Sequence, residues 1–181
     1  MVKTYIPATI SYRDVIIGQW IHHGIHHLQV NIDKTKIMHV RKITVNRCDF
    51  SFLLGNITID FVEKYRYLGL MISENMDYTV SVKELSSAAS RALGSLTSKY
   101  LHMGNMDYAT YTKIYESTVI PVMDYASGVW GSKPYDVLER IQYRAIRTFL
   151  GVGKTAPIPA ITGDMGWTSV HINNQCNVIR L

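Results

Sequence analysis

The chain has 181 residues and a mass of 20.6 kDa, which suits one compact domain with an appendage rather than two full domains. Hydrophobic residues make up 47% of the sequence and charged residues 18%, so the composition excludes a mainly disordered chain. The net charge of +5 is compatible with a polyanionic partner but does not require one. The sequence lacks a membrane-spanning apolar segment, a signal-peptide core and a CxxC pair, so we expect an intracellular protein with no membrane association.

The first 76 residues are rich in β-branched residues and predict a helix followed by short strands. Apolar residues recur at helical spacing from Asp14 to Gln29, which predicts the helix in spite of two glycines. Gly55 and Asn56 separate two of the expected strands and are typical of a tight hairpin turn. The four strands are expected at Ile37–Val40, Phe50–Leu54, Ile57–Val62 and Tyr65–Ile72.

From Asp77 onward the apolar spacing becomes helical. The expected helices are Asp77–Met103, a helix from Asp107 until Pro121 breaks it, a resumption over Val122–Trp130, and Val137–Leu150 with Pro134 at its start. Asp107 is a suitable N-cap, and Gly104 and Gly151 stand where C-terminal caps belong. We therefore expect an α+β protein of three parts, residues 1–76, a helical bundle over 77–150 and a tail over 151–181.

The helix expected at Val137–Leu150 has two distinct faces. At about 100° per residue its apolar side chains fall within about 80° of one another, and Arg140, Arg144 and Arg147 cluster on the other side. Guanidinium groups donate bidentately to phosphate oxygens and stay charged, so this row is a candidate nucleic-acid contact. The alternative is an ordinary solvated helix face.

A second concentration of positive charge precedes the expected hairpins. Lys34, Lys36, Arg41, Lys42 and Arg47 lie within 14 residues, with the hydroxyl of Thr35 beside them. Backbone contact with a nucleic acid uses this combination and weakens steeply with salt. The alternative is an exposed strand edge that lysine keeps soluble.

Four histidines, His22, His23, His26 and His27, form two i,i+4 pairs on the expected first helix. Neither pair has a convincing third ligand or the glutamate of an HExxH motif, so a helix with exposed imidazoles is the favoured interpretation. The sequence GVGKT at Gly151–Thr155 lacks the first glycine and the preceding strand of a P-loop. The nine aspartates include no adjacent pair, so no site for two magnesium ions is visible and no cofactor is expected.

Several segments, read in order, resemble a known family. LQVNIDKTKIMHVRK at Leu28–Lys42 and KYRYLGLMI at Lys64–Ile72 resemble the last palm elements of reverse transcriptases of non-LTR (LINE-like) retrotransposons. SAASRALGSL, IPVMDYASGVWG and LERIQYRAIRTFLGV resemble the helical thumb and the region beyond it. The resemblance covers roughly residues 14–170.

The resemblance implies a role for each motif. Lys34, Thr35 and Lys36 would lie near the phosphates of the incoming nucleotide, and Tyr67, Leu68 and Gly69 would form the primer-grip hairpin. The family's Asp-Asp strand, fingers and magnesium site are expected outside this chain, so we expect a palm-end and thumb fragment that is inactive alone and binds template and primer at most. The alternative is a non-enzymatic interaction module or an inert remnant of a transposable element.

Overall fold

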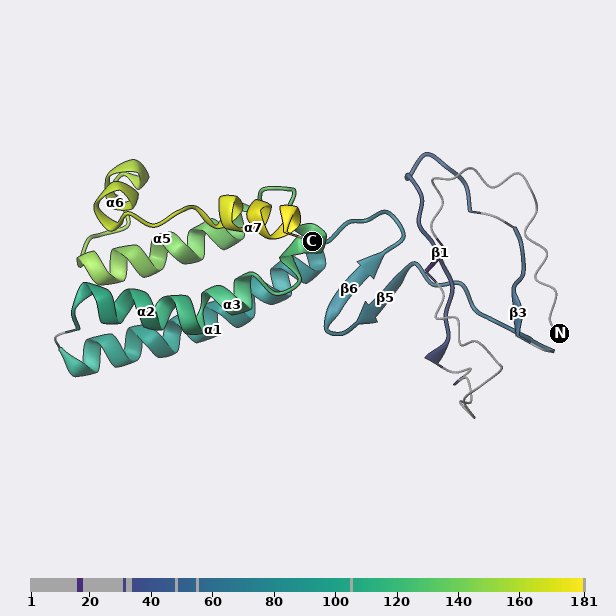
Figure 1. The fold of residues 1–181 in the computed structure, drawn as a ribbon, viewed down its shortest axis with the longest axis horizontal. Helices are drawn as coiled ribbons and strands as arrows, with labels where there is room; N and C mark the ends of the chain where they lie inside the picture. The colour runs from purple at the N-terminus through teal and green to yellow at the C-terminus, as the bar shows by residue number, and fades with distance from the viewer. Residues whose placement is uncertain are drawn as a thin grey trace. The chain divides into compact units, whose positions relative to one another are not determined.

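The computed structural model describes residues 16–17, 31, 34–47, 49–54, 56–104 and 106–180. The chain divides into two compact units, Met1–Tyr78 and Thr79–Leu181, and the boundary lies two residues beyond the expected one at residue 76. The described elements of the first unit are strands and those of the second are helices, which makes the protein α+β (Figure 1). The expected order of strands followed by helices is therefore confirmed.

The described strands of the first unit form three antiparallel pairs. β1 pairs with β2, β3 with β4, and β5 with β6. Their bounds are β1 Ile16–Ile17, β2 Met38–His39, β3 Leu53–Leu54, β4 Ile57–Thr58, β5 Lys64–Tyr67 and β6 Leu70–Ser73. A parallel bridge between Ile37 and Phe61 links the strand pairs, supported by hydrogen bonds of the Ile37 amide with Asp60 and of its carbonyl with Val62. The hairpin expected between the second and third strands is confirmed, because Leu54 pairs with Ile57 across a two-residue loop.

The helix predicted for Asp14–Gln29 is wrong at Ile16 and Ile17, which pair with His39 and Met38 as strand β1. Adjacent β-branched residues fit a strand once a partner strand is present, and this long-range pairing overrides the helical spacing. The rest of the predicted helix, with its four histidines, lies outside the described residues.

The single strand predicted for Tyr65–Ile72 is also wrong, because the segment turns back on itself. Tyr67 pairs with Leu70, and the two residues between them, Leu68 and Gly69, have φ angles of 47° and 86°. Positive φ at both central residues is the signature of a type I′ hairpin turn. Leucine is an unusual residue at the first of these positions, because left-handed backbone is unfavourable for a residue with a Cβ atom.

The second unit contains seven helices among its described residues. They are α1 Thr79–Met103, α2 Tyr108–Thr118, α3 Ile120–Met123, α4 Ser127–Trp130, α5 Asp136–Leu150, α6 Ile158–Met165 and α7 Val170–Ile179. The predicted caps are confirmed, since Gly104 and Gly151 adopt φ of 69° and 65° and the Asp107 carboxylate accepts the Thr110 amide at 3.2 Å. Pro121 lies in the first turn of α3, where proline is tolerated. The helical run is therefore interrupted before the proline, at Val119, which separates α2 from α3.

The resumed helix predicted over Val122–Trp130 is wrong as one element. Ala126 adopts φ of 54° and separates α3 from α4. The tail beyond residue 150 contains two helices that the sequence patterns did not indicate. α6 contacts α5, and α7 contacts α4 and α5, so the tail packs onto the bundle.

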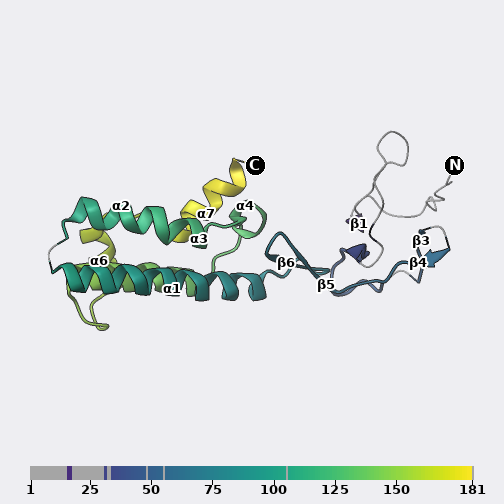
Figure 2. The same cartoon turned by 90° about the horizontal axis from the view of Figure 1, so that it is seen from below.

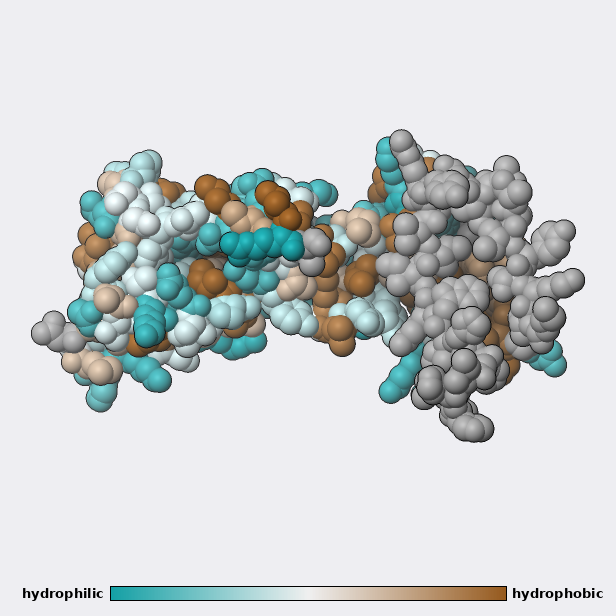
Figure 3. Space-filling model, in the orientation of Figure 1, coloured by the Kyte–Doolittle hydropathy of each residue, from teal (hydrophilic) through white to brown (hydrophobic). Residues whose placement is uncertain are grey.

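The bundle is built around α1 and α5, which lie side by side and run in the same direction (Figures 1 and 2). The apolar face predicted for α5 is buried, with Leu138 and Ala145 almost fully buried, and so is Leu93 of α1. Tyrosine hydroxyls tie the helices together, because Tyr111 donates to the Ala145 carbonyl at 2.9 Å and Tyr100 to the Phe149 carbonyl at 3.1 Å. The face of the bundle seen in Figure 3 is a mixture of hydrophilic and intermediate residues with scattered apolar patches.

None of the helices in the described part of the chain is long and apolar enough to cross a membrane.

Candidate nucleic-acid interface

Lys34, Thr35 and Lys36, here called the lysine segment, begin with a hydrogen-bonded turn on Asn31. The Lys34 amide donates to the Asn31 side-chain oxygen at 3.1 Å, and the Thr35 hydroxyl donates to the Asn31 carbonyl at 2.8 Å. Such side-chain bonds to the backbone fix a turn locally. The Thr35 hydroxyl hydrogen is thereby engaged, whereas the Lys34 side chain is exposed.

The lysine segment touches the β5–β6 hairpin. Tyr65 of β5 donates its hydroxyl to the Lys34 carbonyl oxygen at 3.2 Å. At the end of the same hairpin Tyr67 is 54% exposed and Leu68 74% exposed. The structure thus places the backbone of Lys34 against a hairpin whose tip carries an exposed aromatic ring, although the two segments lie more than 30 residues apart in sequence. Tyr65 makes this contact and was not among the predicted site residues, although it alternates with Tyr67 along the strand.

Lys36 and Lys42 have different surroundings although both belong to the basic concentration. Lys36 forms a 2.8 Å ion pair with Asp60, whereas Lys42 is exposed and has no ion pair within the described residues. Of the three lysines in the basic concentration, Lys34 and Lys42 are therefore the two that remain accessible to a polyanion.

Arg41 and Arg47 converge on the buried carboxylate of Glu74. The Arg41–Glu74 and Arg47–Glu74 distances are 3.0 and 2.9 Å, and Arg47 also pairs with Glu63 at 2.8 Å. The hydrogen bond from Arg47 holds the pKa of Glu74 below its usual range, against the opposing effect of burial. These two arginines stabilise the first unit from within and are not available as a continuous basic surface.

The predicted row of three arginines on α5 is divided by the structure. Arg140 and Arg144 are exposed, whereas Arg147 is half-buried and donates to the Ala156 carbonyl at 3.3 Å. Arg147 therefore holds the loop that follows α5, and Arg140 and Arg144 remain as the solvent-facing pair.

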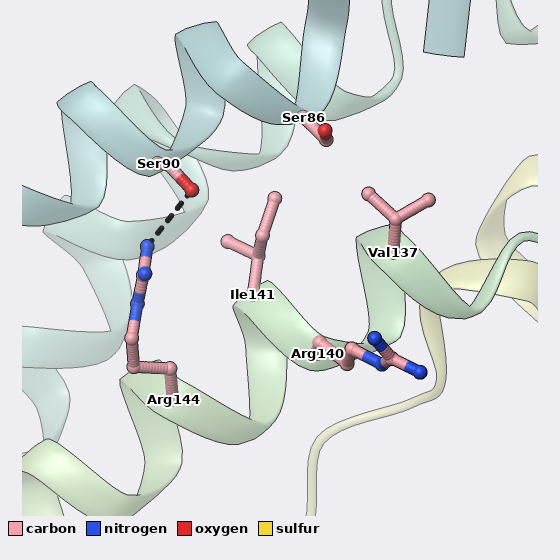
Figure 4. Close-up of a pocket in the computed structure, with 6 residues that line it drawn as sticks. All are labelled: Ser86, Ser90, Val137, Arg140, Ile141 and Arg144. Carbon is pink, nitrogen blue, oxygen red and sulfur yellow. Dashed lines mark hydrogen bonds between the residues drawn. The ribbon is translucent and has the colours of Figure 1, made fainter. Parts of the chain in front are cut away.

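Arg140 and Arg144 border a pocket of about 130 Å³ between α1 and α5, which we call the α1–α5 pocket. Its six lining residues are Ser86, Ser90, Val137, Arg140, Ile141 and Arg144 (Figure 4). The Arg144 guanidinium donates to the Ser90 hydroxyl at 3.0 Å. Neither serine was among the predicted site residues. Their four-residue spacing places both on one face of α1, but only the packing of α5 shows what they face.

Another group of buried polar atoms lies around α7. Tyr115, Asp124, Glu139 and Asn174 each have a buried side-chain oxygen with no hydrogen-bond partner among the described residues. Burial raises the pKa of Asp124, although a hydrogen bond with Asn177 acts in the opposite direction. Buried polar atoms of this kind lower stability unless water reaches them.

A two-magnesium site does not fit the described residues. No three His, Cys, Asp or Glu side chains gather there as a metal ion would require. The carboxylate of Asp60 pairs with Lys36, and that of Asp107 caps α2. The described part of the chain therefore offers no carboxylate cage for nucleotidyl transfer.

Comparison of the chain with models of protein families, with curated proteins and with solved structures found no match.

Proposed function

We propose that the chain is the palm end and thumb of a reverse transcriptase of the non-LTR retrotransposon type, and that it binds an RNA/DNA template–primer without copying it. The observation that carries this proposal is the bond between the Tyr65 hydroxyl and the Lys34 carbonyl. It joins the two segments on which the family resemblance rests, one with an exposed lysine and one with a tight hairpin. A helical bundle follows them in the chain, as a thumb follows a palm.

The chemistry of the joined surface supports a backbone-directed binding mode. An exposed ammonium group attracts phosphate and releases counterions when it binds, and an exposed tyrosine ring stacks on a base regardless of its identity. Lys34 and Tyr67 offer these two groups. Binding by such groups is independent of sequence and weakens as salt rises.

Fluorescence anisotropy of a labelled RNA/DNA hybrid duplex tests this proposal with the full chain at several salt concentrations. We expect Lys34→Ala to weaken binding roughly 3- to 10-fold and to lower the salt slope by about 1. Tyr67→Ala should weaken binding with little change in the slope, because it removes stacking and no charge. Lys113→Ala, at an exposed position on α2, is the matched charge control. Equal losses from Lys34→Ala and Lys113→Ala, or no binding at low salt, would contradict the proposal.

A second candidate is an interaction module, or remnant, that never meets nucleic acid. It is favoured by the ion pairs of Lys36, Arg41 and Arg47, which engage three of the five cations of the basic concentration at residues 34–47. Binding that is absent at low salt would support this candidate.

A further inference from the structure

We propose that the α1–α5 pocket is an oxyanion site that holds one phosphodiester group of a nucleic-acid backbone. This inference rests on the proposed function for the identity of the ligand, but the pocket's chemistry stands by itself. The pocket is in the helical unit and shares no residue with the lysine segment or the β5–β6 hairpin.

The arginines supply the charge and most of the donors. Arg144 uses one nitrogen to donate to Ser90, so its guanidinium is held in one orientation while the remaining N–H groups stay available. Arg140 is exposed and makes no hydrogen bond or ion pair with any described residue. In Figure 4 the Arg144 guanidinium extends towards Ser90, whereas the Arg140 guanidinium lies on the other side of Ile141 and points away from Arg144. An oxyanion at Arg144 and Ser90 would therefore meet the second guanidinium group only after the exposed Arg140 side chain turns towards it.

The two serines are not equivalent. Ser90 accepts the Arg144 bond and keeps its hydroxyl hydrogen to donate to a ligand. Ser86 already donates its hydroxyl hydrogen to the Lys83 carbonyl at 2.8 Å, so it lines the pocket without offering a donor to the ligand. Val137 and Ile141 form an apolar part of the lining, which lowers the local dielectric and strengthens the attraction of the arginines for an anion.

The size of the pocket indicates what it holds. About 130 Å³ is well below the roughly 300–1,000 Å³ of pockets that enclose a whole small molecule, so the pocket accepts one group of a larger ligand. Residues 79–181 carry ten Lys and Arg against seven Asp and Glu, so the surrounding unit also favours an anionic polymer. A backbone phosphodiester meets both conditions.

The test is binding of the full chain to the labelled RNA/DNA hybrid, with inorganic phosphate as a competitor. Arg140→Gln and Arg144→Gln should each weaken hybrid binding roughly 3- to 10-fold and lower the salt slope by about 1. Arg91→Gln removes the same charge from an exposed position of α1 outside the pocket, and it should have a smaller effect. Ser90→Ala should weaken binding about 3-fold, whereas Ser86→Ala should leave it unchanged, because only Ser90 has a hydrogen to donate.

The outcomes separate the pocket from the wider proposal. Hybrid binding that depends on Lys34 but not on Arg140 or Arg144 would refute the assignment of the pocket as a phosphodiester site without contradicting the proposed function. Absence of hybrid binding, with inorganic phosphate still perturbing the Arg140 and Arg144 side-chain resonances, would overturn the proposed function and show a site for free phosphate instead. Equal effects of Ser86→Ala and Ser90→Ala would refute the assigned donor. If Arg144→Gln lowers only the unfolding temperature, the residue joins α5 to α1 and binds nothing.

Discussion

The turn of the β5–β6 hairpin holds a leucine in a conformation that L-residues rarely adopt. Leu68 has φ of 47°, and left-handed backbone costs a residue with a Cβ atom about 1–2 kcal/mol. Leu68→Asn should recover much of this cost, because asparagine tolerates the left-handed region and Asn-Gly is the preferred pair for a type I′ turn. Leu68 is 74% exposed, so the change loses little buried apolar area. We expect the free energy of opening the hairpin to rise by about 1 kcal/mol.

Hydrogen exchange of the β5 and β6 amides measures this opening directly. Met76→Asn is the matched control, since Met76 has φ of 55° and is 44% exposed but lies outside the hairpin. It should also relieve strain, although the protection of β5 and β6 should not change. Faster exchange in Leu68→Asn would refute the strain that we assign to the turn.

The same pair of variants separates stability from binding. Strained residues tend to gather at functional sites, and the exposed Leu68 side chain offers apolar surface to a bound strand. Leu68→Asn should therefore weaken RNA/DNA hybrid binding roughly 3-fold while it stabilises the hairpin. Met76→Asn should leave binding unchanged. If Leu68→Asn binds as well as the parent chain, the tip of the hairpin is not part of the interface.

Four further outcomes are expected. Gly131→Ala should destabilise the helical unit by about 1–3 kcal/mol in urea unfolding, because its new Cβ would lie 2.5 Å from the Ser127 carbonyl oxygen. Gly94→Ala on α1, which has open space around it, should instead stabilise the helical unit by up to about 1 kcal/mol. The pKa of Glu74 is lowered from its ordinary value of 4.5, so its contribution to stability is fully present above that value and is lost as pH falls through the lower, folded-state pKa. Glu74→Gln should therefore flatten the acid dependence of the melting temperature below pH 4.5. The raised pKa of Asp124 has the opposite sign, so Asp124→Asn should stabilise the protein near neutral pH by an amount that shrinks in acid. Primer extension with Mg²⁺ or Mn²⁺ should give no product with this chain under conditions in which a control polymerase extends the primer. Incorporation that a point change in this chain abolishes would contradict our expectation that the chain is inactive alone.

The positions and ends of α1, α2 and α5 were predictable because they depend on residues close in sequence. Asp107 caps α2 through an amide three residues away, and Gly104 and Gly151 end their helices by a local backbone conformation. The prediction of a helix at Asp14–Gln29 was wrong because a distant partner decided the outcome. Ile16 and Ile17 became a strand because Met38 and His39 pair with them.

In the candidate sites too, features that depend on nearby residues were predictable and contacts between distant residues were not. The sequence indicated that Arg140, Arg144 and Arg147 share a helix face, and it indicated the exposed cation of Lys34. It did not indicate that Arg147 bonds the carbonyl of Ala156. Nor did it indicate the serines of α1 that face Arg140 and Arg144, since these contacts join residues about 50 positions apart.

The amino-acid sequence by itself determined the α+β order, the helical spacing of the second half and the caps, since each follows from local backbone preference and apolar periodicity. Tertiary structure alone decided which cations stay open to solvent. Glu74 is a buried carboxylate whose negative charge needs a cationic partner, and chain topology brings Arg41 and Arg47 to it but not Lys34 or Arg140.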